Sequence, residues 1–390
     1  MVIFTLNFSF LRGKANFRFY NRCSMYLQKL SLINFKNYRE AEFAFSEGVN
    51  CFAGNNGVGK TNLLDAIHYL SFCKSFFNPI DSQNILHGED FFVIQGTFAS
   101  GKETDEVYCG LKRNQKKQFK RNKKEYSRLA DHIGLFPVVM ISPADADLIN
   151  DGSESRRKFI DSVISQFDRN YLDNLIQYNK VLLQRNALLK SFADNKKFDK
   201  NSLEVWDLQM IDYGKKIHEK RKEFMEMFSP FFQKHYELVS GAEERVDLEY
   251  VSQLNQSDFR SMLEEVLRKD RIVQYSTVGI HKDDLAFKIN GYPVKKYGSQ
   301  GQQKSYLIAL KLAQFDFIKK MKKITPVLLL DDIYDKLDES RMKHLMNLVS
   351  NDNFGQIFIT DTHQDRIAKL FKNDKNIFRL FKINNEVVSS

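Results

Sequence analysis

The stretch VNCFAGNNGVGKT, residues 49–61, decides the fold of this chain. Its last eight residues match G-x-x-x-x-G-K-[ST], and the apolar pattern predicts a strand before them and a helix over Asn62–Phe72 after them. Glycines let successive backbone N–H groups turn toward phosphate oxygens, and the helix N-terminus adds a favourable dipole. We therefore predict a site for the phosphates of a nucleotide, ATP, made by Gly54, Asn55, Asn56, Gly57, Val58, Gly59, Lys60 and Thr61.

A second stretch, VLLLDD at residues 327–332, supplies carboxylates for the same site. It predicts a buried strand that ends in Asp331 and Asp332. We expect Asp331 and the Thr61 hydroxyl to bind Mg²⁺, while Lys60 neutralises the β- and γ-phosphates. Asp332 is the candidate for orienting or deprotonating an attacking water, so Lys60 and Asp332 are the candidate catalytic residues. Neighbouring carboxylates can exchange roles, and Asp331 stays open as the alternative base.

Residues 297–304, YGSQGQQK, precede a predicted helix over Gln303–Lys320. Ser299 and Gln302 form an S-x-x-Q capping box, which by itself indicates only a well-capped helix. The same geometry, with a hydroxyl and a bare glycine at a helix N-terminus, also favours an anion. Ser299, Gly301 and Gln302 are therefore candidates for contacting the γ-phosphate of a nucleotide carried by another subunit.

Together these stretches resemble the ATPase heads of the ABC type, whose signature motif is S-x-G-Q before a helix. Lys336-Leu337-Asp338 is similar to their D-loop, and residues 32–38 (LINFKNY) resemble the start of SMC-like members. Three further stretches are similar to the bacterial RecF family of recombination proteins, namely residues 142–145, 152–161 and 279–285. The resemblance runs from about Met25 to Ile383, nearly the whole chain.

The resemblance implies an ATP-dependent homodimer in which each signature motif closes on the partner's nucleotide. It also implies binding of single-stranded and gapped duplex DNA, cooperation with RecO and RecR, help in loading RecA, and slow hydrolysis that resets a switch. Two departures stand out. No glutamine lies near Ser142, where an ABC head has its Q-loop, and His363 is either a γ-phosphate sensor or the cap of a strand end.

The expected fold class is α/β, an ABC-type head with a mixed sheet and an inserted helical lobe. Residues 25–150 and 272–390 are predicted to form the ATPase lobe, lobe I. Helical periodicity dominates residues 151–271, predicted as lobe II, with helices over Phe159–Gln184, Leu203–Phe228 and Asp258–Arg268. Strand patterns return at Ile272–Val278 and Leu285–Ile289.

The charge of the chain is concentrated in one segment. The formal net charge is +10, yet residues 112–128 alone hold nine lysines and arginines against one acid, Glu125. The pattern predicts a hairpin that turns near Asn122-Lys123, with Phe119 and Tyr126 interleaved. Such a run is either a solvated sheet edge or a surface for DNA phosphates. The DNA candidates are Lys116, Lys117, Lys120, Arg121, Lys123 and Lys124.

Other features narrow the function classes. Residues 1–24 lack the order of a secretory signal, so we interpret them as a disordered leader or a mis-assigned start before Met25. No apolar run approaches a membrane span, and the cysteine spacing fits neither a zinc ribbon nor a disulfide scaffold, so a cytoplasmic protein is expected. Residues 281–284 (HKDD) could form a metal or acid/base cluster, but we favour a structural or interlobe role. The alternative function is an ATPase subunit of another ABC-type system, for transport or SMC-like.

Overall fold

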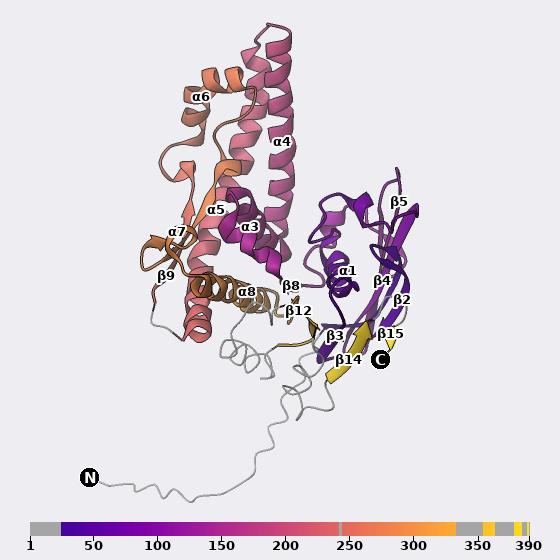
Figure 1. Ribbon diagram of the computed structural model, residues 1–390. Helices are drawn as coiled ribbons and strands as arrows, with labels where there is room; N and C mark the ends of the chain where they lie inside the picture. The colour runs from indigo at the N-terminus through magenta and orange to yellow at the C-terminus, as the bar shows by residue number, and fades with distance from the viewer. Residues whose placement is uncertain (1–24, 242–243, 333–353, 363–377, 384–387, 390) are drawn as a thin grey trace, which may run out of the picture.

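The computed structural model describes residues 25–241, 244–332, 354–362, 378–383 and 388–389 (Figure 1). Lys336-Leu337-Asp338, His363 and the segment 1–24 lie outside the described residues. Within those ranges, no helix is both long enough and apolar enough to cross a membrane.

A mixed sheet carries the nucleotide loop. Its strand order is β15-β14-β3-β13-β12-β8, and all neighbouring strands run parallel except β15, which pairs antiparallel with β14. The strand predicted before the nucleotide loop and the strand predicted at residues 327–330 are both present, as β3 and β12. The strands are β3 (Val49–Ala53), β8 (Val138–Ile141), β12 (Val327–Leu330), β13 (Ile357–Asp361), β14 (Phe378–Ile383) and β15 (Val388–Ser389).

This sheet is buried on both faces, which explains why its strands are continuous apolar runs. Leu328 and Leu330 pack into one hydrophobic core with the long helices, whereas Val327 and Leu329 pack into a second core with α1 (Lys60–Phe72). Alternation along a strand sends successive side chains to opposite faces. The sheet therefore separates two cores. The nucleotide loop follows β3 and lies at the carboxyl ends of the parallel strands.

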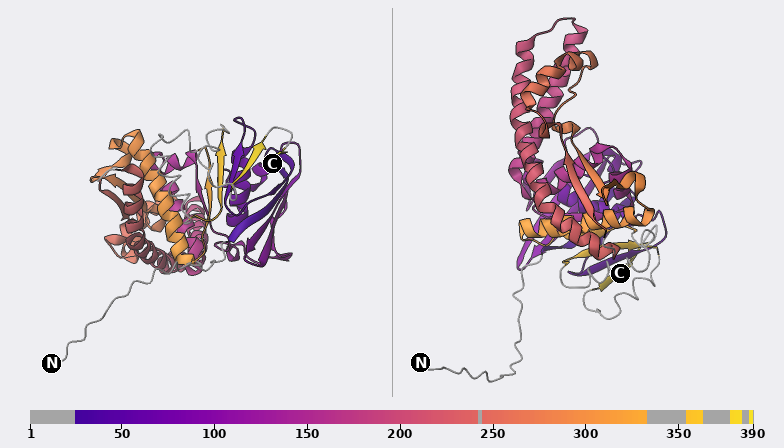
Figure 2. Two further views of the ribbon diagram at one scale, coloured as in Figure 1. Left: turned by 90° about the horizontal axis from the view of Figure 1, so that it is seen from below. Right: turned by 90° about the vertical axis from the view of Figure 1, so that its left-hand side faces the viewer.

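The second core is completed by an antiparallel sheet of order β2-β1-β4-β5-β6-β7. Within it, β1 and β2 form a hairpin in the register Leu32↔Ala41. Figure 2 shows the two sheets on one side of the molecule and the helices on the other. The strands are β1 (Met25–Phe35), β2 (Tyr38–Ala44), β4 (Phe91–Ser100), β5 (Glu103–Lys112), β6 (Gln118–Arg121) and β7 (Lys124–Glu125).

The helices pack against the other face of the mixed sheet, and α4 and α5 rise from it as a long arm (Figures 1 and 2). The single helix predicted over Phe159–Gln184 is in fact two, because Asp168 ends α3 and its carboxylate caps α4 by accepting from the Tyr171 N–H. The helices are α2 (Asp147–Asn150), α3 (Ser153–Phe167), α4 (Arg169–Asp194), α5 (Lys200–Ser240), α6 (Phe259–Val273), α7 (Val294–Tyr297) and α8 (Gln300–Lys322).

One strand prediction is wrong, and four strands of the described residues, β9 (Val246–Val251), β11 (Tyr292–Pro293), β14 and β15, were not predicted. The segment Ile272–Val278 is no strand, because α6 continues to Val273 and Gln274 then ends it in the left-handed conformation. Strand β9 pairs with β10 (Asp284–Ile289), which also pairs with β11. This small sheet joins strands from both sides of residue 271, where we divided the chain into two lobes. The division stays a prediction.

Candidate nucleotide site and nucleic-acid surface

The nucleotide loop has a backbone that only glycine can supply at three positions. Gly57 and Gly59 have φ angles of 83° and 107°, in the left-handed region that side chains rarely adopt. A Cβ on Gly59 would lie 2.3 Å from Asn37 Nδ2, and one on Gly54 would lie 2.4 Å from the Ile383 carbonyl oxygen. Gly57 and Gly59 are thus required by the left-handed turn, and Gly54 and Gly59 by close packing.

The turn between β1 and β2 holds this loop from outside. Asn37 Nδ2 donates to the Val58 carbonyl at 3.0 Å, and the Tyr38 hydroxyl donates to the Gly59 carbonyl at 3.1 Å. Asn62 Nδ2 in turn donates to Asn37 Oδ1 at 2.7 Å. Sequence reasoning reached residues 32–38 only through resemblance and gave Asn37 no role. No local signal links it to the loop, because the contact joins two turns distant in the chain.

Lys60 and Thr61 lie where the motif predicts, at the start of α1. The Lys60 ammonium is buried and donates to the carbonyls of Gly54 and Asn55 at 2.8 and 2.9 Å. It therefore spans the mouth of its own loop, where incoming phosphates would meet it. Asn55, Asn56 and Gly57 form the exposed tip of the loop, whereas Val58 is buried beneath it.

Asp331 lies directly beside this loop at the end of β12. Its Oδ1 accepts from Thr61 Oγ1 and from Thr360 Oγ1, both at 2.9 Å. Burial raises the pKa of Asp331, and the two hydroxyl hydrogen bonds oppose that rise. The structure thus brings the predicted pair Thr61 and Asp331 together, and it adds Thr360 on β13, which sequence reasoning missed.

Asp332 follows in an unusual backbone conformation. Its φ angle is 44°, which an aspartate tolerates better than most residues, and its N–H donates to Thr360 Oγ1 at 2.9 Å. Its side chain is half-buried. Of the two carboxylates, that of Asp331 accepts the hydrogen bonds from the Thr61 and Thr360 hydroxyls.

The segment with Ser299, Gly301 and Gln302 forms the predicted capping box at the start of α8. Ser299 Oγ accepts from the Gln302 N–H at 3.2 Å, and Gln302 Oε1 accepts from the Ser299 N–H at 2.7 Å. The Gln302 amide also donates to Glu244 Oε1 at 2.7 Å. This end of α8 lies near α7, on the far side of β12 from α1 (Figure 1). One chain therefore does not bring the segment to its own nucleotide loop.

The basic segment forms the predicted hairpin. Strands β6 and β7 pair antiparallel, and the two turn residues Asn122 and Lys123 have φ angles of 51° and 67°, as a tight hairpin requires. Lys116, Lys123 and Lys124 are exposed. Lys120 is half-buried, with its ammonium 5.4 Å from the centre of the Tyr108 ring.

Two of the six predicted DNA-binding residues already have partners within the protein. The Lys117 ammonium points inward, where it donates to the Cys73 carbonyl at 2.6 Å and pairs with Asp81 at 2.7 Å. Arg121 donates through Nε and Nη2 to the two carboxylate oxygens of Asp105, at 2.7 and 2.8 Å. Both charges are paired within the protein, although the Arg121 side chain is 40% exposed, so the contact of these two residues with DNA stays a prediction that their pairing disfavours.

The aromatic residues of the hairpin also point inward. Phe119 is 1% exposed and belongs to the second core, while the Tyr126 hydroxyl lies 3.0 Å from His132 Nδ1. Neither ring is a free platform for stacking bases. The candidate DNA surface is therefore a purely ionic one of three exposed lysines and Lys120.

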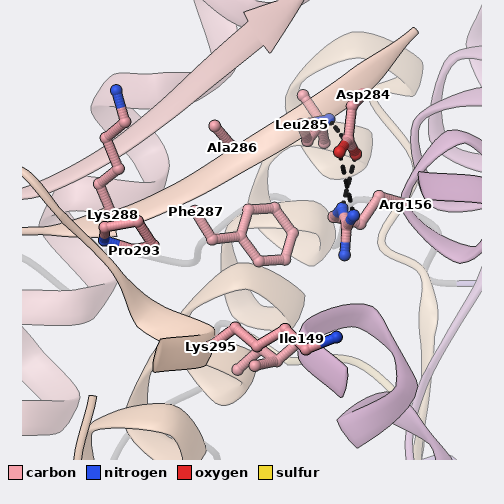
Figure 3. A pocket seen from close by; sticks show the side chains of 9 residues that line it. All are labelled: Ile149, Arg156, Asp284, Leu285, Ala286, Phe287, Lys288, Pro293 and Lys295. Atoms are coloured by element: carbon pink, nitrogen blue, oxygen red, sulfur yellow. Dashed lines mark hydrogen bonds and ion pairs between the residues drawn. The ribbon is translucent and has the colours of Figure 1, made fainter. Parts of the chain in front are cut away.

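Residues 279–285, which include the HKDD stretch, make structural contacts, and this is the role that we favoured for that stretch. The buried Arg221 guanidinium donates to Asp283 at 2.7 Å and to Asp161 at 2.8 Å. Arg156 pairs with Asp284 through two hydrogen bonds beside a small pocket of about 150 Å³ (Figure 3). These contacts join residues 152–161 to residues 279–285, two of the three stretches that are similar to the RecF family. Among the described residues, no group of His, Cys, Asp and Glu could hold a metal ion by itself.

The sequence of this chain is similar to those of known proteins over nearly its full length. Residues 26–389 match the family described as RecF/RecN/SMC N terminal domain. The chain is 53% identical over 359 residues to the "DNA replication and repair protein RecF" of Flavobacterium johnsoniae, covering 92% of this chain and all of that protein. It is 54% identical over 361 residues to the protein of the same name from Phocaeicola vulgatus, covering 92% and 96%.

Solved structures agree with the sequence matches. A structure titled as the recombination mediator protein RecF with ATP superposes with a TM-score of 0.84 at 31% identity, covering 94% of this chain and 98% of that one. An Smc head domain from Pyrococcus furiosus superposes with a TM-score of 0.53 at 17% identity, covering 94% and 95%, which shows the fold alone. The chain belongs to the RecF family, within the RecF/RecN/SMC group.

Proposed function

We propose that this protein is an ATP-dependent DNA-binding protein of replication and recombinational repair, which dimerises on ATP to hold gapped or single-stranded DNA. The convergence of Lys60, Thr61 and Asp331 on one phosphate-binding loop supports ATP as the ligand most directly. The relatives named for DNA replication and repair, and the related structure with ATP, support the same function.

The residues of the loop and its neighbour Asp331 have different roles in binding the phosphates. The backbone N–H groups between Gly54 and Thr61 would bind phosphate oxygens, and Lys60 would exchange its carbonyl partners for the β- and γ-phosphates. Thr61 and Asp331 present two oxygens 2.9 Å apart, the hard ligands that Mg²⁺ prefers, so they would hold the ion together with the phosphates. When bound, Mg²⁺ would neutralise charge on the phosphates.

Asp332 is our candidate for positioning the attacking water, since its neighbour Asp331 is occupied by two hydroxyls. We propose slow hydrolysis as the step that resets the protein. The Thr360 hydroxyl contacts both aspartates, the first through its carboxylate and the second through its backbone N–H. Thr360 would therefore keep the two carboxylates in their separate positions during turnover.

An incomplete site in one chain supports dimerisation. Ser299, Gly301 and Gln302 offer a capped helix N-terminus, which favours an anion. The same segment lies across the sheet from its own nucleotide loop (Figure 1). A second copy could place it against the γ-phosphate, so we propose an ATP-dependent homodimer. By the same family relationship, we propose that RecO and RecR act with this protein and that it helps to load RecA.

DNA binding measured with and without ATP tests the proposal. We expect fluorescence anisotropy with gapped duplex, single-stranded and fully duplex DNA to show tighter binding with ATP, and light scattering to show a dimer under the same conditions. A salt series should reveal a strong ionic component, since phosphate contacts release counterions. Equal DNA affinity with and without ATP on all three substrates would refute the proposed clamp.

A further inference from the structure

A carboxylate from the chain between α5 and β9 contacts residues 299–302, which we call the signature segment. Glu244 Oε1 accepts from the Gln302 side-chain amide at 2.7 Å, and Glu244 Oε2 accepts from the Tyr236 hydroxyl at 2.5 Å. Tyr236 lies near the end of α5 and Gln302 in the first turn of α8, and these two helices pack against each other (Figure 1). One half-buried carboxylate therefore joins the base of the arm to the signature segment.

The contact with Glu244 fixes the direction in which the Gln302 amide points. An ionised carboxylate can only accept hydrogen bonds, so the amide nitrogen of Gln302 must face it. The amide oxygen then faces the Ser299 N–H, from which it accepts at 2.7 Å. Reversing the amide would turn its oxygen toward the carboxylate and its N–H groups toward the Ser299 N–H, and both hydrogen bonds would be lost. Glu244 thus selects the orientation of Gln302 in which the capping box closes.

The capping box in turn sets the position of the Ser299 hydroxyl. Its oxygen accepts from the Gln302 backbone N–H at 3.2 Å, and an accepting hydroxyl can still donate its own proton. Ser299 is exposed at the N-terminus of α8, where the helix dipole favours an anion. The hydroxyl that we propose to meet the γ-phosphate of a second copy's nucleotide is therefore held by Gln302, and Gln302 is held by Glu244.

Glu244 is itself anchored on two sides. The Tyr236 side chain that donates to it is fully buried, with its ring centre 6.1 Å from that of Tyr306 on α8. Two residues further along the chain, the Val246 N–H donates to Gln233 Oε1 on α5 at 3.2 Å. A fixed partner orients a side chain more precisely than a mobile one, and an ionised acceptor makes a stronger hydrogen bond than a neutral one. Glu244 therefore has the support that an orienting group needs.

The charge of Glu244 decides between a direct and an indirect role in the nucleotide site. A carboxylate repels a phosphate, so Glu244 is not suited to bind the γ-phosphate of a nucleotide itself. Both of its oxygens also accept hydrogen bonds already, from Tyr236 and from Gln302. A favourable contribution of Glu244 to the nucleotide site must therefore pass through Gln302 and the capping box.

We propose that Glu244 is a positioning residue for the signature segment, which holds Gln302, and through it Ser299, ready for the nucleotide of a second copy of the chain. The inference rests on the proposed ATP-dependent homodimer and names a residue that prepares one half of its interface. Because the segment is ordered before two chains meet, less conformational freedom is lost when they associate. Glu244 would thus favour dimerisation without contacting the nucleotide of its own chain.

Glu244→Ala in the full-length protein is the first test. Without ATP, we expect faster hydrogen exchange at the Ser299 amide, because the Gln302 side chain that covers it is no longer held. With ATP, the protein concentration at half-maximal dimerisation, measured by light scattering, should rise about tenfold, the effect of losing one hydrogen bond to a charged group. Titration of a fluorescent ATP analogue against dilute, monomeric protein should give the wild-type affinity, because the loop at Lys60 is unchanged.

Two further variants separate the positioning role from the effect of charge. Glu244→Gln removes the charge but keeps an oxygen that can accept from Gln302, so its dimerisation and its Ser299 exchange should stay close to those of the wild type. Glu226→Ala, the same change at an exposed position of α5, is the matched control and should alter none of these quantities. Circular dichroism checks that each variant is folded.

The outcomes distinguish this inference from the proposed function on which it rests. A wild-type protein that binds ATP yet stays monomeric would refute the proposed homodimer, and the inference with it. If the wild type dimerises, equal dimerisation or unchanged Ser299 exchange in Glu244→Ala would overturn the positioning role alone. Tighter dimerisation of both Glu244 variants would show that the carboxylate acts only by repelling phosphate, and equal weakening of both would show that its charge is what matters. Either result would also overturn the positioning role.

Discussion

The nucleotide loop and the basic hairpin were both predicted from short stretches of sequence, yet the structure treats them differently. In the loop, every motif residue lies in the expected turn, because glycine geometry and the helix start are set locally. In the hairpin, the turn forms as expected, but some of the positive charges are paired within the protein and others are not. Lys117 and Arg121 are occupied by Asp81 and Asp105, and only part of the positive charge remains free.

The difference lies in what each motif encodes. A phosphate-binding loop works through backbone N–H groups, whose directions follow from φ and ψ and hence from the residues themselves. A run of lysines acts through the charged ends of its side chains, and the partners of those charges come from other segments of the chain. For the hairpin, these partners are Asp81 and Asp105. Position-specific sequence patterns therefore predict this site better than composition does, and the predictions below test that contrast.

Asp332→Asn should give the largest effect. Asparagine adopts the left-handed conformation of Asp332 readily, so the backbone should stay unchanged while the proton acceptor is lost. We expect steady-state hydrolysis to fall by about 10²–10⁴-fold with ATP binding retained. Asp331→Asn is the companion variant, and it should instead weaken Mg²⁺-dependent ATP binding. Normal hydrolysis by Asp332→Asn would remove Asp332 from the role of base.

Lys60→Ala should weaken ATP binding by about 100-fold, in line with the loss of charge-assisted hydrogen bonds to phosphate. Titration with a fluorescent ATP analogue measures this directly. Lys116→Ala on the hairpin is a control of the same chemical change and should leave ATP affinity unchanged. If both variants bound ATP equally well, the loop would lose its assignment as the nucleotide site.

Replacing Lys116, Lys123 and Lys124 together by alanine tests the hairpin. These exposed lysines should contribute about three phosphate contacts, so the slope of log affinity against log salt should fall by about 2.7. At moderate salt we expect roughly tenfold weaker DNA binding, with ATP affinity unaffected. An unchanged salt slope would show that the hairpin is a solvated sheet edge and that DNA binds elsewhere.

Lys117→Met separates structural charge from functional charge in the same hairpin. Its side chain is 11% exposed, and its ammonium pairs with Asp81 and donates to the Cys73 carbonyl, so its loss should cost about 2 kcal/mol of unfolding free energy. DNA affinity of the folded protein should stay the same. Weaker DNA binding without a loss of stability would instead return Lys117 to the DNA surface.

Much of the fold could be predicted, because its strands and helices have strong periodicity and clear ends. The break at Asp168 was missed, since the apolar pattern continues across it and only the side-chain cap reveals it. Strand β9 was missed because it is short and half-exposed, and its pairing with β10 joins distant parts of the chain. Such features depend on tertiary contacts that no local window contains.

The site shows the same division. Lys60, Thr61 and Asp331 could be predicted because two motifs with known chemistry carry them. Asn37 and Thr360 could not, since their importance comes from hydrogen bonds to residues far away in sequence. Their residue types did not indicate a function either, because asparagine is common in turns and threonine is common in strands.

The smallest effect concerns His132, which anchors the base of the hairpin. Its Nε2 lies 2.6 Å from the Leu70 carbonyl, which can only accept, so Nε2 carries the proton and Nδ1 accepts from the Tyr126 hydroxyl. Burial lowers the pKa of His132 to about 4. In the unfolded chain a histidine titrates near 6.5, so on acidification the unfolded state takes up the proton first.

The stability due to neutral His132 is therefore complete above about pH 6.5 and is lost as the pH falls toward 4. At pH 5.5 the loss should be about 1.4 kcal/mol relative to pH 7.5. Urea unfolding of the wild type and of His132→Gln at both pH values measures it, because the variant should lose that much less on acidification. His87→Gln, at an exposed position, is the control and should keep the wild-type pH dependence. Equal acid sensitivity of all three proteins would mean that the hairpin's anchor is not held by a neutral histidine.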